Sequence, residues 1–167
     1  GVLEYLIWST DGTDAGTTVA DPSRVFIQPT NLLASGNKLF YVSDATGVGR
    51  TLWVTDGTTP GTERLPLTGT AGGGSNVGPI VKLGSTLYFS ANLEPTIRRE
   101  VWKSDGTPEG TLLVRDLTPG INSSNPRELT DVNGTLYFIA DFNPLGRDSQ
   151  TRLYRSDGTP EGTIELL

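Results

Sequence analysis

One short motif occurs four times in the chain: Asp-Gly-Thr, then two residues, then Gly-Thr. Its side-chain and backbone oxygen atoms could bind a metal ion. Carboxylate and carbonyl oxygens are the ligands that Ca²⁺ prefers, but this ion takes about six to eight of them. Each copy offers one carboxylate, or two where Asp14, Glu109 or Glu161 turns inward. An Asp at the start of a turn can instead accept a hydrogen bond from the backbone amide two residues on. The motif therefore favours capping of a loop, and calcium binding is the alternative.

The capping interpretation gives each residue of the triplet a role. The glycine tolerates a positive φ angle that other residues avoid, and the threonine adds hydroxyl hydrogen bonds of the same local kind. We expect no bound cofactor in these loops. The residues predicted to cap them are Asp11, Gly12, Thr13, Asp56, Gly57, Thr58, Asp105, Gly106, Thr107, Asp157, Gly158 and Thr159.

The composition excludes several other kinds of chemistry. The 167 residues include no His and no Cys, which rules out a Ser-His-Asp hydrolase, a thiolate nucleophile and a histidine-ligated metal enzyme. The formal net charge is -6, and the 13 basic residues form no run that could follow a phosphate backbone, so we expect no nucleic-acid partner. No stretch approaches the roughly 20 apolar residues that span a bilayer, so we expect no membrane insertion.

The motif belongs to a long repeat. Successive aspartates of the triplets lie 45, 49 and 52 residues apart, and apolar strand patterns flank the loops, which predicts a hairpin at each copy. A second hairpin is predicted between the copies, in NLLASGNKLFYVSD, PIVKLGSTLYFSAN and ELTDVNGTLYFIAD. The central pairs Gly36-Asn37, Gly84-Ser85 and Asn133-Gly134 suit two-residue turns. Each full repeat therefore predicts four short strands.

Four short antiparallel strands in about 48 residues are typical of one blade of a β-propeller. The predicted fold is therefore all-β, with about three and a half propeller-type blades in a single array. The predicted units are a half blade over residues 1–21 and full blades over residues 22–67, 68–117 and 118–167. A β-helix with two rungs per unit is the alternative architecture.

An aromatic residue stands three positions before each of the four aspartates: Trp8, Trp53, Trp102 and Tyr154. Each directly follows an aliphatic residue of the same predicted strand. Large rings in a repeated strand are expected to pack between neighbouring blades. A surface on which sugar rings stack is the alternative use of these side chains.

The chain resembles the ELWxxDGT repeat family of large secreted or surface proteins of bacteria. The third copy carries the resemblance best, in EVWKSDGTPEGTLLVRDLTPG followed by SSNPRELTDVNGTLYFIAD, and the other copies are more divergent. The resemblance implies an extracellular or cell-surface repeat protein with propeller-like blades. It supplies no catalytic residues.

The repeat count predicts an incomplete array. Four hairpins carry the Asp-Gly-Thr motif, but only three hairpins of the other kind are present, so the first blade lacks one half. A closed propeller needs about four to eight full blades, and an open array exposes strand edges and apolar faces. We therefore expect the chain, which begins at Gly1 without a Met, to pair with other copies of itself or with the rest of a longer parent chain. Two copies would not complete the set, since they would hold eight hairpins of one kind and six of the other.

These features favour a structural or adhesive module that associates through its incomplete blades into a filament, a ring or a surface layer. The alternative is a carbohydrate- or protein-binding part of a larger secreted propeller protein. A glycosidase that uses two carboxylates is the third hypothesis, but no unrepeated acidic pair stands out, so we expect no enzymatic activity. The least repetitive stretch, residues 141–152, holds Asp141, Arg147 and Asp148. A function that the other repeats do not share would depend on these residues. A variable surface loop explains this stretch more simply.

Overall fold

The computed structural model describes residues 5–20, 27–45, 49–67, 76–93, 97–119, 123–142 and 150–166. Every regular element in these ranges is a β-strand, which confirms the predicted all-β class. The described residues contain no helix with the length and apolar character of a membrane span.

The strands form one small sheet and three larger ones, and all pairs are antiparallel. The small sheet, which we call the first hairpin, consists of β1 (Trp8–Ser9) and β2 (Thr18–Val19). Blade 1 consists of β3 (Ile27–Ser35), β4 (Lys38–Ala45), β5 (Gly49–Thr55) and β6 (Glu63–Leu65). Blade 2 consists of β7 (Ile80–Leu83), β8 (Thr86–Leu93), β9 (Ile97–Ser104) and β10 (Leu112–Arg115). Blade 3 consists of β11 (Arg127–Val132), β12 (Thr135–Phe142), β13 (Gln150–Ser156) and β14 (Ile164–Leu166).

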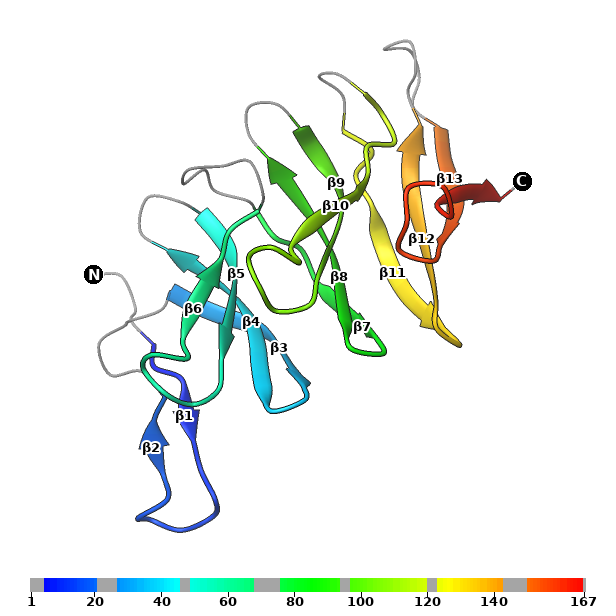
Figure 1. Cartoon of the computed structure of the whole chain (residues 1–167). Coiled ribbons are helices and arrows are strands. Elements are labelled where there is room, and N and C mark those ends of the chain that lie inside the picture. Colours follow the sequence, from blue (N-terminus) through cyan, green and yellow to red (C-terminus); the bar gives the residue numbers. More distant parts are fainter. Residues whose placement is uncertain are drawn as a thin grey trace.

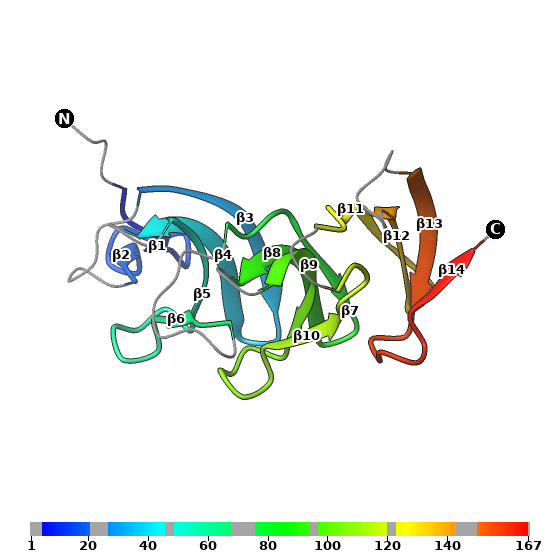
Figure 2. The same cartoon turned by 90° about the horizontal axis from the view of Figure 1, so that it is seen from above.

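The arrangement of the sheets is that of propeller blades. Within each blade the strands pair in sequence order, so the chain enters at one edge strand and leaves at the other. The entry strand β7 contacts β3 of blade 1 and β11 of blade 3, so the entry strands gather along one side of the array. The sheets stand side by side in chain order, with the first hairpin and blade 3 at opposite ends (Figures 1 and 2). The protein therefore contains about three and a half propeller-type blades.

The four strands of each blade lie inside the ranges 22–67, 68–117 and 118–167. The borders between these units stay predictions: residues 21–26 and 68–75 lie outside the described ranges, and the border after residue 117 falls in the connection between β10 and β11.

Two-residue turns join the first two strands of each blade. Gly36 and Gly84 begin these turns with φ angles of 60° and 59°. In blade 3 both turn residues, Asn133 and Gly134, have positive φ angles, of 52° and 81°. Glycine and asparagine accept this left-handed backbone at low cost, which explains why the chain reverses there.

The hydrophobic core is divided among the interfaces between neighbouring sheets. The first hairpin and blade 1 share Ile7, Ala20, Tyr41 and Trp53. Blades 1 and 2 share Phe40, Val42, Leu52, Val54, Leu65, Leu67, Val77, Leu87, Phe89, Ala91 and Trp102. Blades 2 and 3 share Leu83, Tyr88, Val101, Val114, Leu136, Phe138, Ala140 and Tyr154. Successive side chains of a strand point to opposite faces, so Phe40 and Tyr41 belong to different interfaces.

Candidate functional site

The four Asp-Gly-Thr loops share one hydrogen-bonding pattern. In blade 2, Asp105 Oδ1 accepts the backbone N–H of Thr107 at 2.9 Å and its hydroxyl at 2.7 Å. The Thr107 hydroxyl oxygen accepts the N–H of Gly110 at 3.0 Å. The loops at Asp11, Asp56 and Asp157 repeat these bonds, with distances between 2.7 and 3.1 Å. The carboxylate thus closes its own loop.

Hydroxyl residues outside the predicted capping triplet complete the loop. Ser104 shares a 2.8 Å hydrogen bond with Thr111 and accepts the N–H of Gly106. The Thr111 hydroxyl donates to the carbonyl oxygen of Thr107. The equivalent pairs are Thr10 with Thr17, Thr55 with Thr62 and Ser156 with Thr163. The signal was present in the sequence, since Ser or Thr directly precedes every one of the four aspartates.

The aspartate of each loop leaves room only for glycine at the second Gly position of the motif. A Cβ atom at Gly110 would overlap the Asp105 carboxylate, and the same holds at Gly16, Gly61 and Gly162 for their own aspartates. Asp105 therefore packs directly against the backbone across its loop. Any side chain at Gly110 would displace the carboxylate from its threonine donors.

The loop hydrogen bonds also set the charge of the aspartates. Bonds from the Thr107 hydroxyl and backbone amide lower the pKa of Asp105, and equivalent bonds lower the pKa of Asp11, Asp56 and Asp157. These carboxylates are therefore ionised at neutral pH and held by local donors. Among the described residues, no group of three or more acidic side chains is placed to hold a metal ion.

Three of the four repeated aromatic residues lie in interfaces between sheets. Trp53, Trp102 and Tyr154 are buried in the three clusters described above. The Tyr41 and Trp53 rings stack with centroids 6.4 Å apart, and the Phe138 and Tyr154 rings with centroids 5.4 Å apart. Trp53 and Tyr154 therefore stack on a ring of their own sheet, and all three aromatic residues contribute to the contact with the preceding sheet.

Trp8 departs from the prediction that it packs between blades. Its side chain is 60% exposed, and it borders a hollow of about 330 Å³ that Lys38 and Leu39 also line. Trp53 is covered by Tyr41 of its own sheet and by the first hairpin. In the described part of the chain, β1 has neither a strand on its other edge nor a preceding sheet, so nothing covers Trp8 in this way.

The Asp-Gly-Thr loops also contact the preceding blade. A Cβ atom at Gly106 would lie 2.7 Å from Cζ of Phe40, and one at Gly158 would overlap the hydroxyl of Tyr88. Lys103 Nζ donates a 2.8 Å hydrogen bond to the carbonyl oxygen of Gly158. The loops of blades 2 and 3 therefore each sit on an aromatic ring of the blade before them, whereas a Cβ atom at Gly57 of blade 1 would meet nothing within 4 Å.

The outer face of blade 3 has no sheet against it in the described structure. The strand register places Val132, Tyr137, Ile139, Leu153, Arg155 and Leu166 on this face. Leu153 is 42% exposed, whereas its counterpart in blade 2, Val101, is 2% exposed. Val132 is 47% exposed, whereas its counterpart Leu83 is 9% exposed. Positions that are core in blade 2 are therefore open in blade 3.

A buried carboxylate ties β9 to the connection between blades 2 and 3. Glu100 is fully buried, and its oxygens accept hydrogen bonds from the amides of Leu117 and Ser124 and from the hydroxyls of Thr118 and Ser124. Burial raises the pKa of Glu100 to about 7, although these donors oppose the shift. The sequence alone does not predict this role of Glu100, because its partners lie 17 to 24 positions away.

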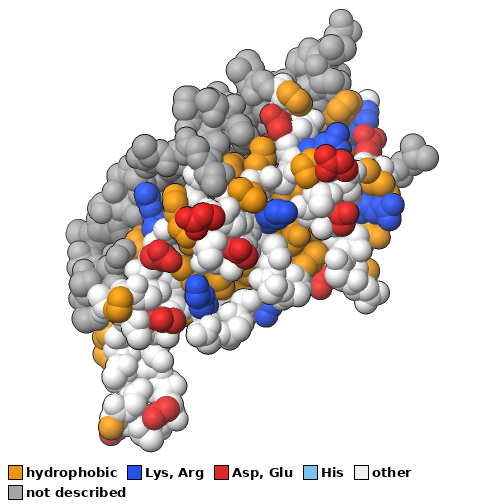
Figure 3. Space-filling view, viewed as in Figure 1, with side chains coloured by type: hydrophobic (Ala, Val, Ile, Leu, Met, Phe, Trp, Pro, Cys, Tyr) orange, Lys and Arg blue, Asp and Glu red, His pale blue; other side chains and the backbone are white. Residues whose placement is uncertain are grey.

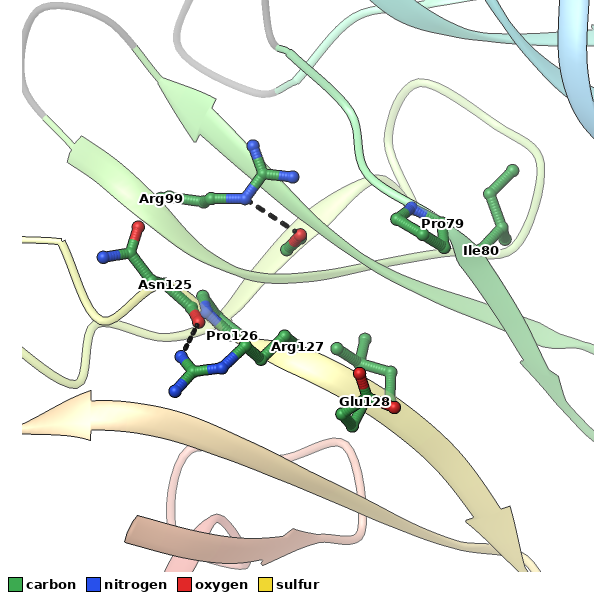
Figure 4. Close-up of a pocket in the computed structure, with 9 residues that line it drawn as sticks. Pro79, Ile80, Arg99, Asn125, Pro126, Arg127 and Glu128 are labelled. Atoms are coloured by element: carbon green, nitrogen blue, oxygen red, sulfur yellow. Dashed lines mark hydrogen bonds between the residues drawn. The ribbon is translucent and has the colours of Figure 1, made fainter. Parts of the chain in front are cut away.

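A pocket of about 450 Å³ lies between blades 2 and 3. It is lined by Pro79, Ile80, Ser90, Arg99, Asn125, Pro126, Arg127, Glu128 and Leu129 (Figure 4). Arg99 donates to Ser90 Oγ at 3.1 Å and to the carbonyl oxygen of Asn76 at 2.9 Å. No carboxylate of the described residues forms an ion pair with Arg99, and burial lowers the pKa of its guanidinium. This pocket thus holds a half-buried positive charge.

Part of the irregular stretch 141–152 is described. Asp141 accepts hydrogen bonds from Arg127 Nη1 at 3.0 Å and from the Thr151 hydroxyl at 3.1 Å. Arg147 and Asp148 lie outside the described residues. On the face drawn in Figure 3, acidic and basic side chains are interspersed and neither sign forms a continuous patch.

No family model matches the chain, and no curated protein matches its sequence. Among solved structures, the chain is similar to an alpha-L-arabinofuranosidase from Clostridium thermocellum ATCC 27405, with 16% sequence identity and a TM-score of 0.36. The match covers 86% of this chain and 51% of the arabinofuranosidase, so the chain spans about half the length of that protein. Similarity at this level assigns neither a family nor an activity to the chain.

Proposed function

We propose that the chain is a structural repeat module that associates through the open faces at the two ends of its blade array. The observation that carries this proposal is the exposure of core positions on the outer face of blade 3, above all Leu153 and Val132. Burying apolar surface stabilises by about 25 cal/mol for each Å² removed from water, so an open blade face favours a covering sheet. Among the described residues, the first hairpin at the other end is a sheet of only two strands.

Location and family are part of the same proposal. The repeated Asp-Gly-Thr loops support membership of the ELWxxDGT repeats, and that membership would place the chain outside the cell or on its surface. We assign no catalytic step and no cofactor to it.

The substitution Leu153→Lys is expected to raise the dissociation constant of self-association at least tenfold, because it places a charge in the centre of the covered face.

Raising the salt concentration is expected to strengthen association of the unmodified chain, because it screens repulsion between copies of net charge -6. Sedimentation velocity over a concentration series measures both effects.

The matched control is Leu112→Lys, since Leu112 is 41% exposed, close to Leu153, but lies on β10 of blade 2, the middle blade of the array. It should associate like the unmodified chain. Equal behaviour of the two variants, or a monomer at every concentration, would contradict the proposal.

The pocket at Arg99 favours a second candidate, the binding of a carbohydrate that carries a carboxylate. A half-buried guanidinium that has no ion-pair partner among the described residues attracts an anion, and Pro79, Ile80, Pro126 and Leu129 offer apolar walls to a sugar ring. Titration with glucuronate followed by calorimetry should detect binding that Arg99→Gln weakens about tenfold. The variant Arg64→Gln, which changes an arginine of β6 outside the pocket, should bind like the unmodified chain. Equal binding by both variants would reject this candidate.

A further inference from the structure

The two blade interfaces repeat one contact between a loop glycine and an aromatic ring. Gly106 of blade 2 lies against Phe40 of blade 1, and Gly158 of blade 3 lies against Tyr88 of blade 2. Phe40 and Tyr88 occupy the same repeat position, directly after the leucines at 39 and 87. The next residue in this series is Tyr137, which follows the leucine at 136. Tyr137 lies on the outer face of blade 3, and no described glycine loop covers it.

The first hairpin carries the matching unoccupied loop. Gly12 has a φ angle of 92°, close to 90° at Gly106 and 88° at Gly158, so the three loops have the same backbone shape at this residue. A Cβ atom at Gly12 would meet nothing within 4 Å, whereas the other two glycines are in contact with their rings. The Gly12 loop therefore has the shape of the two loops in contact and, like the loop at Gly57 of blade 1, has no ring against it. Gly57 lines the hollow beside the first hairpin of its own chain, so Gly12 is the open loop at the end of the array (Figure 1).

We propose that the first hairpin of a second copy docks on the outer face of blade 3, with Gly12 of that copy against Tyr137. This inference rests on the proposed self-association and specifies which residues of the two copies meet. Lys103 donates to the carbonyl oxygen of Gly158, and Arg155 stands at the same repeat position, so in this register it would donate to the carbonyl oxygen of Gly12 in the second copy. Within one chain the two surfaces lie at opposite ends of the array, so the contact joins different copies (Figure 1).

This contact is heterologous, because it joins two different surfaces of the same chain. Each added copy offers a free outer face on its own blade 3, so association continues head to tail and produces a ring or a filament.

Cross-linking of two single-cysteine variants tests the register, because the natural chain has no cysteine to interfere. One variant is Asp14→Cys, in the loop of the first hairpin. The other is Thr135→Cys, which stands at the repeat position of Lys38, the second side chain near Gly106. Equal amounts are mixed and treated with a short bismaleimide. The expected product is a covalent dimer that contains one chain of each variant, with little product from either variant alone.

The internal equivalent of this pair is the positive control. Pro160→Cys and Thr86→Cys in one chain occupy the same repeat positions across the interface of blades 2 and 3, so they should cross-link within the chain. Adding Tyr137→Asp to the Thr135→Cys chain should lower the yield of mixed dimer about tenfold. A sample that light scattering shows to be assembled but that gives no mixed dimer would overturn the register and leave self-association standing. A sample that is monomeric throughout would overturn both.

Discussion

Replacing Trp102 with alanine is expected to lower the free energy of unfolding by about 3–5 kcal/mol, the usual cost of removing a buried aromatic side chain. Trp102 is among the largest fully buried side chains of the protein and lies in the cluster shared by blades 1 and 2. Its indole N–H donates to the carbonyl oxygen of Ala91 at 3.2 Å, so the substitution also removes the donor from a buried carbonyl. The loss is a large share of a typical total stability of about 5–15 kcal/mol.

Urea denaturation followed by far-ultraviolet circular dichroism measures this loss without relying on tryptophan fluorescence. Trp8→Ala is the matched control, because Trp8 occupies the same repeat position but is 60% exposed. It is expected to change stability by no more than about 0.5 kcal/mol. Equal losses for the two variants would contradict the assignment of Trp102 to the contact between blades.

Stability is expected to fall as the pH rises from 5 to 8, because Glu100 is buried. Its folded-state pKa of about 7 lies above its ordinary value of 4.5, so folding favours the protonated form. The contribution is fully present below pH 4.5 and is lost as the pH rises through 7. A pKa unit corresponds to about 1.4 kcal/mol, so the expected loss is on the order of 3 kcal/mol. The loop aspartates have lowered pKa values, so their contribution is lost only as the pH falls below about 4.

Thermal melting at pH 5, 6, 7 and 8 measures this dependence. The variant Glu100→Gln keeps the shape of the side chain but has no proton to exchange, so its melting temperature should vary far less over the same range. A melting temperature of the unmodified chain that is constant or rises from pH 5 to 8 would show that Glu100 does not titrate as described.

Much of the architecture could be predicted because its determinants are local. The turn at Asn133 and Gly134 depends on two adjacent residues that accept a left-handed backbone. The hydrogen bonds of Asp105 join residues two positions apart, and the same residue types recur in each loop. A period of 45 to 52 residues then implies that equivalent hairpins build equivalent sheets.

Contacts between sheets could not be predicted in the same way. Glu100 and Ser124 meet only because β9 and the entry to blade 3 are neighbours in space. Trp8 and Trp53 stand in almost the same local sequence, yet one is exposed and the other buried. The difference depends on which sheets surround them, and no local pattern encodes it.

The proposed end-to-end association is tested most directly by the absolute molar mass of the purified chain, measured by light scattering at increasing concentration. We expect the mass to rise well above that of one chain, 17.8 kDa, and to continue past a dimer. Rings or filaments should then be visible in negative-stain images of the same sample. A mass of 17.8 kDa at every concentration would contradict the account.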